Sequence, residues 1–484
     1  MAIRFFQPKL LQNFHHWTRQ LNSASSSLTA VSPLNFVEKH DHHDYFFSSP
    51  LNVHDHEKLF RLISTSKLLR SLLNLNLAAF EPVADLGMWV MNSRLMDVNI
   101  TRGIITGFLK HTFYEHYCAG ESSADAKRCV QKVNDAGLRG MLVYAVEHTD
   151  DKSECDQNLQ KFLQIVESAK SLAPSSVSFV VVKISAICSM SLLKRVSDLL
   201  RWQQKDSSFS LPWKLNDFPI FSDISPLYHT LERPEPLTPE EETELRLGYE
   251  RLLKLCHECQ EGTVPLVVDA EDTVVQPAID YLTYASAITY NKVDNLIVYN
   301  TMQAYLKDAK ERLLLATEAA GKMGVPMGFK LVRGAYMSSE SKIASCLGCE
   351  SPIHNSIEET HACYNDCASF LLGKIANGSG ALVLATHNVK SGQMAAAKAR
   401  DLGIDKKNSR LEFAQLYGMS EALSFGLRNA GFKVSKYMPY GPIDMVIPYL
   451  LRRAEENRGF LSASNLDRQL MSKELKRRLS AALF

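Results

Sequence analysis

Eight short apolar segments recur between residues 140 and 440, and most are separated by segments long enough to form a helix. They lie at residues 140–147, 178–184, 264–271, 295–300, 328–334, 380–388, 410–416 and 433–440. Continuous Val, Ile and Leu segments of this length are typical of parallel strands that are buried on both faces. Eight alternating units predict an α/β fold of the (βα)8 TIM-like barrel type, with a large doubly wound sheet as the alternative.

Composition and periodicity divide the chain into four regions. They are residues 1–36, a targeting segment; 37–130, an N-terminal helical arm; 131–465, the barrel; and 466–484, a basic tail. A proline-rich insertion lengthens the barrel at 205–240, and Thr238-Pro239-Glu240-Glu241 has the pattern of a capped helix start. The tail reads as a basic helix whose role the sequence leaves open.

Residues 1–36 have the composition of an organelle transit segment. They contain no acidic residue, while Arg4, Lys9 and Arg19 are scattered among large apolar side chains and precede a serine-rich stretch. A secretory signal would instead show an uninterrupted apolar core. We expect a segment that is disordered or cleaved, and an ordinary disordered N-terminus is the alternative reading.

The charge balance argues against a nucleic-acid partner. Lys and Arg total 54 against 53 Asp and Glu, so the chain has no global basic bias. No apolar stretch approaches the roughly 20 residues that a membrane-spanning helix needs. We therefore expect a protein that does not cross a bilayer.

Ten cysteines include two CxxC pairs, Cys256/Cys259 and Cys346/Cys349, a spacing that zinc sites also use. The pairs lie far apart in the sequence and the first lies in an expected helix. We expect reduced thiols and no metal, and the second pair, on an expected loop, stays open as a redox-sensitive site.

The segment from Tyr449 to Asn457 places Tyr449, Arg452, Arg453 and Glu456 on one face of an expected helix, because they are three or four residues apart. Two guanidinium groups held by an aromatic ring and a carboxylate can grip a small anion such as a carboxylate. The plain alternative is a solvated charged face. The preceding segment, which reads as a strand with Tyr437 and a Pro/Gly turn, favours a binding site.

Polar residues follow the other predicted strands, where barrel enzymes gather their catalytic groups. They are Lys183, Asp269, Gln303, Lys330, His387 with Asn388, Gln415 and Tyr437. Each alone could be a capping or satisfied core residue, but together they would meet at one barrel mouth. Neither a GxGxxG fingerprint nor a Walker loop is present, so any redox cofactor would lie within the barrel.

These motifs together resemble the proline dehydrogenase family, most closely its monofunctional mitochondrial form in plants. The resemblance covers roughly residues 137–463. It rests on Val182-Lys183-Ile184-Ser185, Asp269-Ala270-Glu271, Met302-Gln303-Ala304-Tyr305, Lys330 to Tyr336, Thr386-His387-Asn388, Gln415 to Met419 and Tyr437 to Asn457. It implies a distorted (βα)8 barrel that holds FAD at the carboxyl ends of the strands, with the last helix over the flavin.

The resemblance also implies roles for individual residues. Substrate would be bound by Arg452, Arg453 and Lys183, which would pair with the proline carboxylate, and by Tyr437, Tyr449, Tyr336 and Leu416 around the ring. Asp269 would orient Tyr437 or an arginine. FAD would be held by Gln303, Lys330, Val332, Gly334, Tyr336, Thr386, His387, Asn388, Gln415 and Glu456. Where some members carry Thr-Arg-Lys near the adenylate, this chain has His354-Asn355-Ser356, so that contact is unassigned.

The reaction implied is oxidation of L-proline to Δ1-pyrroline-5-carboxylate, by hydride transfer from C5 to flavin N5. Electrons would pass to a membrane quinone, with the enzyme on the matrix side of the inner mitochondrial membrane and peripheral to it. Two alternatives stay open. One is a flavin barrel of the methylenetetrahydrofolate reductase type acting on another substrate, and the other is a non-catalytic sensor that binds proline. The sequence gives no prediction of the oligomeric state.

Overall fold

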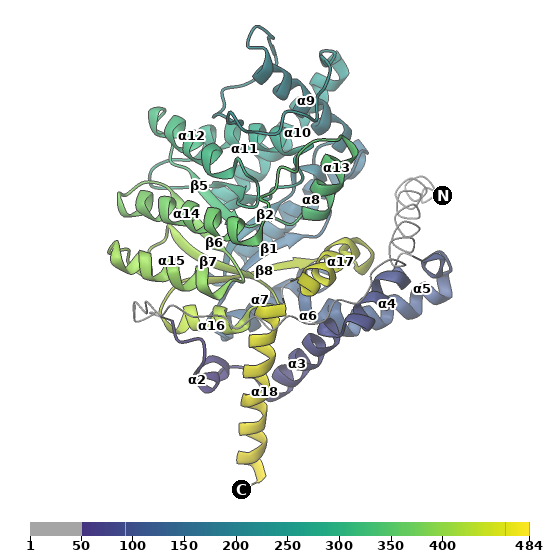
Figure 1. Cartoon of the computed structure of the whole chain (residues 1–484), viewed down its shortest axis with the longest axis vertical. Coiled ribbons are helices and arrows are strands. Elements are labelled where there is room, and N and C mark those ends of the chain that lie inside the picture. The colour runs from purple at the N-terminus through teal and green to yellow at the C-terminus, as the bar shows by residue number, and fades with distance from the viewer. Residues whose placement is uncertain (1–50, 92, 460, 484) are drawn as a thin grey trace, which may run out of the picture.

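Eight parallel strands close into a barrel in which each strand pairs with its sequence neighbours and β1 pairs with β8. The computed structural model describes residues 51–91, 93–459 and 461–483. The strands are β1 Arg139–Tyr144, β2 Val177–Val182, β3 Leu266–Val268, β4 Val298–Gln303, β5 Gly328–Val332, β6 Ala381–Ala385, β7 Leu411–Leu416 and β8 Val434–Tyr440. Each falls in or overlaps one of the eight apolar segments, and the (βα)8 fold is confirmed (Figure 1).

Helices surround the barrel (Figure 1). They are α7 Ser123–Asp135, α8 Lys152–Lys170, α9 Met190–Lys205, α10 Pro239–Glu261, α11 Gln276–Tyr290, α12 Ala309–Lys322, α13 Met337–Cys346, α14 Ile357–Ala376, α15 Val389–Asp401, α16 Glu421–Asn429 and α17 Ile443–Gly459. The expected capping box is present at the start of α10, where Thr238 and Glu241 satisfy each other's backbone N–H groups. Cys346 is the last residue of α13, so only Cys349 lies on the expected loop.

The barrel interior is filled by side chains. Alternate residues of the strands point inward, and Met141, Val143, Phe179, Val181 and Tyr299 form a buried cluster there. The rings of Phe179 and Tyr299 meet edge to face at 5.0 Å between centroids. Because this packing fills the lower barrel, a ligand can enter only at the carboxyl ends of the strands.

The N-terminal arm and the C-terminal helix lie together outside the barrel (Figure 1). The arm contains α2 His56–Phe60, α3 Thr65–Ala79, α4 Glu81–Met91, the 3-10 turn η1 Arg94–Met96, α5 Asn99–Leu109, the π-helical turn η2 Lys110–Tyr114 and α6 Glu115–Tyr117. The C-terminal helix α18, Leu461–Leu483, packs on α2 and α3. The basic tail is therefore joined to the arm, and α17 is followed by a further helix.

The proline-rich segment between α9 and α10 contains neither helix nor strand and packs on the barrel helices through buried Phe218 and Ile220. Ser225 donates a hydrogen bond to Asp308 at 2.6 Å, which ties the segment to the start of α12. The expected transit segment, residues 1–36, lies outside the described residues. In the described part of the chain, no helix combines the length and apolar character needed to cross a membrane.

Candidate active site

Three of the predicted residues, one directly after β3 and the others within β5 and β8, form one hydrogen-bonded chain. The ammonium group of Lys330 donates to one oxygen of Asp269, and the hydroxyl of Tyr437 donates to the other at 2.7 Å. Lys330 also lies over the Tyr437 ring, 5.3 Å from its centroid. Burial raises the pKa of Tyr437 well above its usual value, and the Asp269 carboxylate adds to this effect. Tyr437 therefore stays protonated and fixed in orientation.

A second network joins Lys183 and Arg452 through Glu147, which the sequence analysis did not select. Arg452 donates to both oxygens of Glu147, and the Lys183 ammonium lies 3.4 Å from Oε1. Lys183 also donates to the Tyr336 hydroxyl at 2.8 Å. Burial alone would raise the pKa of Glu147, but Lys183 and Arg452 lower it to about 2. The rule that strand ends carry function could have found Glu147, since it lies three residues beyond β1.

Arg453 points to different partners from its neighbour Arg452. It is only 5% exposed, donates to Glu456 one turn later, and lies with its guanidinium carbon 4.8 Å from the centre of the Tyr449 ring. Among the described residues, neither its Nε atom nor the Tyr449 hydroxyl, both buried, has a hydrogen-bond partner. The helix therefore presents two guanidinium groups that are held separately, and one of them keeps a free donor. Such buried donors are normally paired.

Arg333, a second residue missed by the sequence analysis, organises the polar groups after β5 and β6. Its guanidinium donates to Thr386 Oγ1 at 2.7 Å, to Ser391 Oγ at 2.8 Å and to His361 Nδ1 at 3.0 Å. Asn388 caps α15 by accepting the Ser391 N–H, and its amide nitrogen lies 3.1 Å from His361 Nε2. The predicted residues Thr386 and Asn388 thus belong to one network, which Arg333 completes.

His387 is held neutral inside the site. Its Nε2 accepts the backbone N–H of Leu416 at 3.1 Å. Burial is the main cause that lowers the pKa of His387 to about 3, with the nearby charges of Arg453 and Lys436 adding to it. Gln415 accepts from Ser424 at 2.9 Å and donates to the Thr386 carbonyl oxygen. These contacts fix the ends of β6 and β7 relative to each other.

The remaining predicted residues lie around the same mouth. Gln303 is buried and donates to the backbone oxygen of Glu271 at 2.8 Å. Val332 is half-buried. Gly334, two residues later, has φ +143, and a Cβ added there would lie 2.4 Å from the Tyr305 ring. Glycine is thus required by this ring as well as by the backbone.

Apolar side chains cover the space between these polar networks. Leu416 and Tyr437 pack against a buried cluster that contains Tyr449, Val446 and Met419. This cluster links β7, β8 and the inner face of α17. The predicted substrate residues therefore combine an apolar wall with the buried guanidinium of Arg453.

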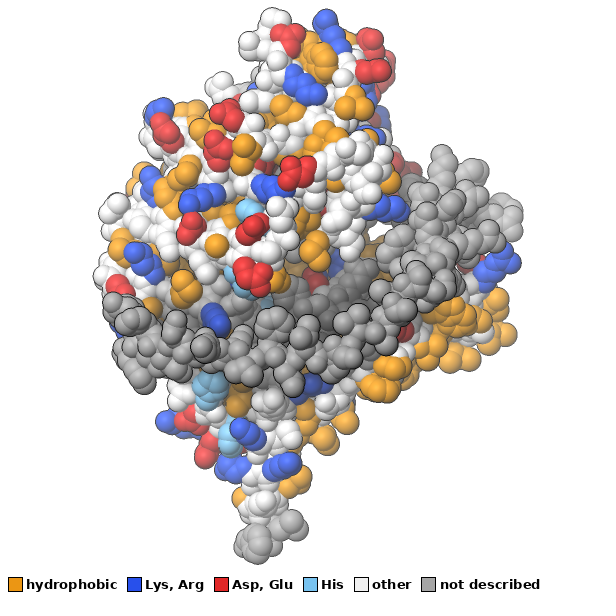
Figure 2. All heavy atoms as spheres, viewed as in Figure 1, with side chains coloured by type: hydrophobic (Ala, Val, Ile, Leu, Met, Phe, Trp, Pro, Cys, Tyr) orange, Lys and Arg blue, Asp and Glu red, His pale blue; other side chains and the backbone are white. Residues whose placement is uncertain are grey.

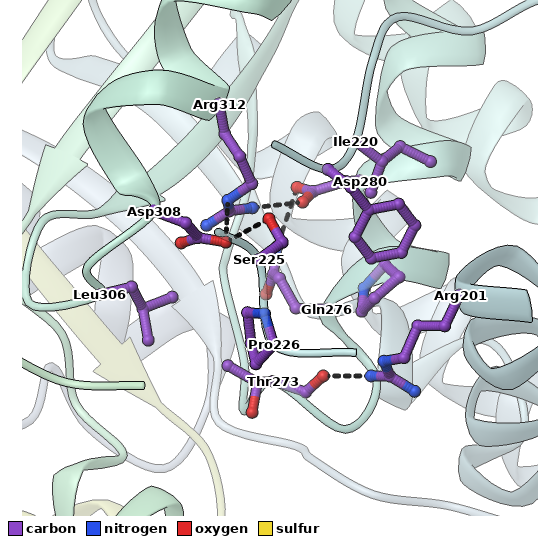
Figure 3. Close-up of a pocket in the computed structure, with 12 residues that line it drawn as sticks. Arg201, Ile220, Ser225, Pro226, Thr273, Gln276, Asp280, Leu306, Asp308 and Arg312 are labelled. Atoms are coloured by element: carbon purple, nitrogen blue, oxygen red, sulfur yellow. Dashed lines mark hydrogen bonds and ion pairs between the residues drawn. The ribbon is translucent and has the colours of Figure 1, made fainter. Parts of the chain in front are cut away.

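A separate cavity lies between the proline-rich segment and helices α9, α11 and α12 (Figure 3). Its polar lining is largely paired, since Arg312 bonds Asp280 at 3.0 Å and lies 3.1 Å from Asp308, which accepts from Ser225. None of the predicted site residues lines it. We interpret these ion pairs as the means by which the segment is attached to the barrel.

The residues at the barrel mouth fit an anionic flavin dinucleotide. Lys183, Lys330, Arg333, Arg452 and Arg453 would supply positive charge to such a ligand, against the carboxylates of Glu147, Asp269 and Glu456. The unpartnered Nε of Arg453 provides a buried donor for a ligand. Tyr336, Tyr437 and Tyr449 offer rings that suit a planar group or an apolar ring. In the described residues, no cluster of His, Cys, Asp and Glu is arranged to hold a metal ion.

Comparisons with known proteins agree with this fold and identify a family. Residues 126–466 match the family model described as proline dehydrogenase. The chain is 56% identical to proline dehydrogenase 2, mitochondrial, of Arabidopsis thaliana over 486 residues, which cover 99% of this chain and 100% of that one. It is 60% identical to proline dehydrogenase 1, mitochondrial, of the same plant, covering 90% of this chain and 87% of that one.

Solved structures share the fold at low sequence identity. Proline utilization A from Bdellovibrio bacteriovorus, inactivated by N-propargylglycine, aligns with a TM-score of 0.61 at 19% identity. The match covers 86% of this chain and 44% of that longer one, so it supports the barrel architecture alone. The family model and the plant relatives extend over most of the sequence, including every predicted site residue. The chain therefore belongs to the proline dehydrogenase family.

Proposed function

We propose that this protein is a flavoenzyme that oxidises L-proline to Δ1-pyrroline-5-carboxylate. The observation that carries the proposal is the buried guanidinium of Arg453, which retains a free donor beside the Tyr449 ring. A buried cation with an unused N–H group provides a strong, directional site for a carboxylate. Family membership supports proline as the molecule that carries it.

The site can hold both ends of a small cyclic amino acid. Arg453, with Arg452 and Lys183 across the mouth, would bind the carboxylate. The rings of Tyr437 and Tyr449, with Leu416, would pack on the methylene carbons, because these side chains form one apolar cluster. Asp269 fixes the Tyr437 ring through its hydroxyl. Holding the substrate in one orientation replaces a bimolecular encounter with a positioned reaction.

FAD is the cofactor that these residues fit. When bound, it would accept at N5 the hydride released from proline C5. Lys330 is paired with Asp269 in a buried position and would supply the positive charge that favours a reduced flavin ring. To the residues inferred from sequence we add Arg333, whose guanidinium group would bind an anionic part of FAD. The FAD-binding set is then Gln303, Lys330, Val332, Arg333, Gly334, Tyr336, Thr386, His387, Asn388, Gln415 and Glu456.

The substrate amine must lose a proton before its lone pair can assist oxidation. Tyr437 is unsuited to take that proton, because burial raises its pKa and it already donates to Asp269. His387 Nε2 is occupied by the Leu416 N–H. We infer that solvent at the mouth receives the proton.

We further propose a mitochondrial location, on the matrix side, with a membrane quinone as electron acceptor. Both plant relatives with the highest identities above carry "mitochondrial" in their names. The acid-free, serine-containing sequence of residues 1–36 is consistent with import into this organelle.

The carboxylate site is tested by Arg453→Met. We expect bound flavin to be retained, as measured by its visible absorbance, and the proline KM to rise at least about tenfold, because a hydrogen bond to a charged group contributes about 1.5–3 kcal/mol. Arg453→Lys serves as the matched control, since it keeps the charge and loses the fork. Wild-type kinetics in Arg453→Met would contradict the proposal.

The alternatives are separated by the flavin spectrum of the wild-type protein. Bleaching on addition of proline supports the dehydrogenase. A flavin that proline leaves unchanged would indicate another substrate, and a colourless protein that binds proline would indicate a sensor. A panel of cyclic amino acids in the same assay separates proline from hydroxyproline.

A further inference from the structure

His148 has a backbone conformation that residues other than glycine seldom adopt. It is the fourth residue after β1, and its φ is +58. Its N–H donates to the Ser185 hydroxyl oxygen at 3.3 Å, and the N–H of Thr149 donates to the Ser185 carbonyl oxygen at 3.0 Å. The segment after β1 is thereby attached to the segment after β2. Costly conformations of this kind are concentrated at functional sites.

The His148 ring connects a buried carboxylate to solvent. Its Nε2 lies 3.4 Å from Oε2 of Glu271, whose side chain is 1% exposed, whereas 46% of the His148 side chain is exposed. Glu271 also accepts hydrogen bonds from the N–H and the hydroxyl of Ser185 at 3.2 and 2.7 Å, which hold its carboxylate in place. Since a carboxylate can only accept, Nε2 carries the proton of the neutral ring, and Nδ1 keeps a lone pair.

The neighbouring titratable groups are unsuited to take a proton from the substrate amine. Burial alone would lower the pKa of Lys183, but Glu147 and Tyr336 raise it, so Lys183 stays protonated. Burial raises the pKa of Tyr336, which therefore keeps its own proton. With a pKa of about 2, Glu147 cannot hold a proton at neutral pH. Burial alone would lower the pKa of His148, but Glu271 and Glu147 raise it above its usual value, so His148 changes its protonation near neutral pH.

The charged groups that act on His148 come from the segments after β1, β2 and β3. They are Glu147, Lys183, Glu271 and Asp272. Three acidic groups and one cation therefore favour the protonated ring. The field of the whole molecule adds little, because the net charge is +1 and side chains of both signs are interspersed over the face drawn in Figure 2. The protonation of His148 is thus determined by its immediate neighbours.

We propose that His148 accepts, through one water molecule, the proton that the proline amine must lose before oxidation. The inference rests on the proposed function, in which Lys183 and Arg452 bind the substrate carboxylate. The amine of an amino acid is attached one carbon from its carboxylate, so these two cations would hold it beside Glu147. Glu147 lies 3.4 Å from Lys183 and directly precedes His148 in the chain. The amine is therefore held close to the segment that carries the imidazole ring.

The proposed path moves protons only and needs no further reactant. The cationic amine gives one N–H proton to a water molecule, and this water gives one of its own protons to Nδ1 of His148. The lone pair left on the substrate nitrogen can then assist the loss of hydride from C5. Glu271 stabilises the imidazolium that forms. Because nearly half of its side chain is exposed, His148 passes the proton on to solvent, which is the final acceptor.

The test compares the pH dependence of flavin bleaching by subsaturating proline in variants of the full chain. His148→Gln keeps an N–H donor for Glu271 but cannot accept a proton. Glu271→Gln removes the charge that raises the pKa of His148. The matched control is His257→Gln, which changes an exposed histidine on α10, outside the candidate site. Thermal unfolding and the visible flavin absorbance check that each variant folds and retains flavin.

We expect the wild-type rate to rise with pH through an inflection between about pH 6.5 and 8, where His148 becomes neutral. His148→Gln should lose this inflection and react at least about tenfold more slowly at pH 7. The deficit should shrink at high pH, where proline arrives deprotonated, and dissolved imidazole should restore the rate of His148→Ala. Glu271→Gln should move the inflection down by about one pH unit, because the carboxylate no longer stabilises the imidazolium. The control should match the wild type.

Four outcomes would overturn the proposal. One is a wild-type profile without an inflection in this range, a result that needs no variant. Another is a His148→Gln profile that keeps the wild-type inflection, and a third is an inflection that Glu271→Gln leaves in place. The last is a loss in His148→Gln that is equal at every pH and that imidazole does not restore in His148→Ala, which would assign the ring a structural role. A flavin that proline bleaches at no pH would refute the proposed function itself, and this inference with it.

Discussion

Glu147 shows how one carboxylate can keep two cations together at a ligand site. It pairs with Arg452 and lies 3.4 Å from Lys183, and both cations lower its pKa to about 2. Removing the charge leaves buried Lys183 and half-buried Arg452 without this carboxylate. We expect Glu147→Gln to lose about 2 kcal/mol of unfolding free energy at neutral pH, below the full value of a buried pair because Arg452 is partly exposed.

The pH dependence of this loss follows from the direction of the shift. Since the pKa is lower in the folded state than its ordinary value of 4.5, the stabilisation by Glu147 is present above about pH 4.5 and disappears as the pH falls toward about 2. Urea unfolding of the wild type and Glu147→Gln at several pH values measures it. A difference that stayed constant down to pH 2 would argue against the paired carboxylate.

At the scale of single residues, the sequence predicted which side chains belong to the candidate site better than it predicted their hydrogen-bond and ion-pair partners. It placed Arg452 and Arg453 on one helix face, and the structure directs one to Glu147 and the other to Glu456. Helical spacing defines which side chains share a face but contains no information on what the opposite elements offer. Arg333 was overlooked for the same reason, since its three acceptors lie on segments far along the chain.

The strands were predictable as elements because they are buried on both faces. β2 and β4 have every residue buried, and β2 accordingly has Val or Phe at five of its six positions, whereas β4 also buries Asn300, Thr301 and Gln303. β3 is shorter than its apolar segment of 264–271, since only Leu266–Val268 forms the strand. Beyond it, the side chain of Asp269 accepts from the Tyr437 hydroxyl and that of Glu271 accepts from the Ser185 N–H.

The start of α16 depends on a residue that no local pattern indicates. Its N-cap, Ser420, has φ +53 and makes no side-chain cap. Asp467 of α18 instead accepts the backbone N–H groups of Glu421 and Ala422 at 2.8 and 2.9 Å. The cap is supplied by a helix about 45 residues away, which a local capping rule cannot detect.

We expect Asp467→Ala to destabilise the protein by about 1–2 kcal/mol, the usual cost of a lost N-cap. Urea unfolding measures the change, and hydrogen exchange should show faster exchange at Glu421 and Ala422 than in the wild type. Ser480→Ala, also on α18, is a suitable control because it leaves this cap intact. Unchanged exchange at both amides would contradict the role given to Asp467.

At the scale of the molecule, the two ends of the described chain support each other. Glu474 of α18 bonds Arg477, Arg478 and His56, and Arg478 donates to the Phe60 carbonyl oxygen at 2.8 Å. The sequence predicted a basic helix at 466–484 but left its role open. Contacts between segments about 400 residues apart leave no trace in hydrophobic periodicity, so the barrel was predictable and this packing was not.

The ten cysteines give a test of the molecule as a whole. All are free thiols, with Cys346 exposed, Cys129 and Cys349 half-buried, and the others buried. We expect a thiol reagent to modify Cys346 rapidly in the native protein and the buried thiols only after unfolding. Cys346→Ser should remove the fast phase. Fewer than ten reactive thiols in the unreduced, unfolded protein would reveal a disulfide and contradict the structure.

The filled barrel interior limits how substrate and product can enter and leave the site. Met141, Phe179 and Tyr299 close the floor, so the barrel offers no rear exit. For the proposed reaction, proline, its oxidised product and the electron acceptor would all enter and leave through the opening at the carboxyl ends of the strands. They would therefore bind one after another.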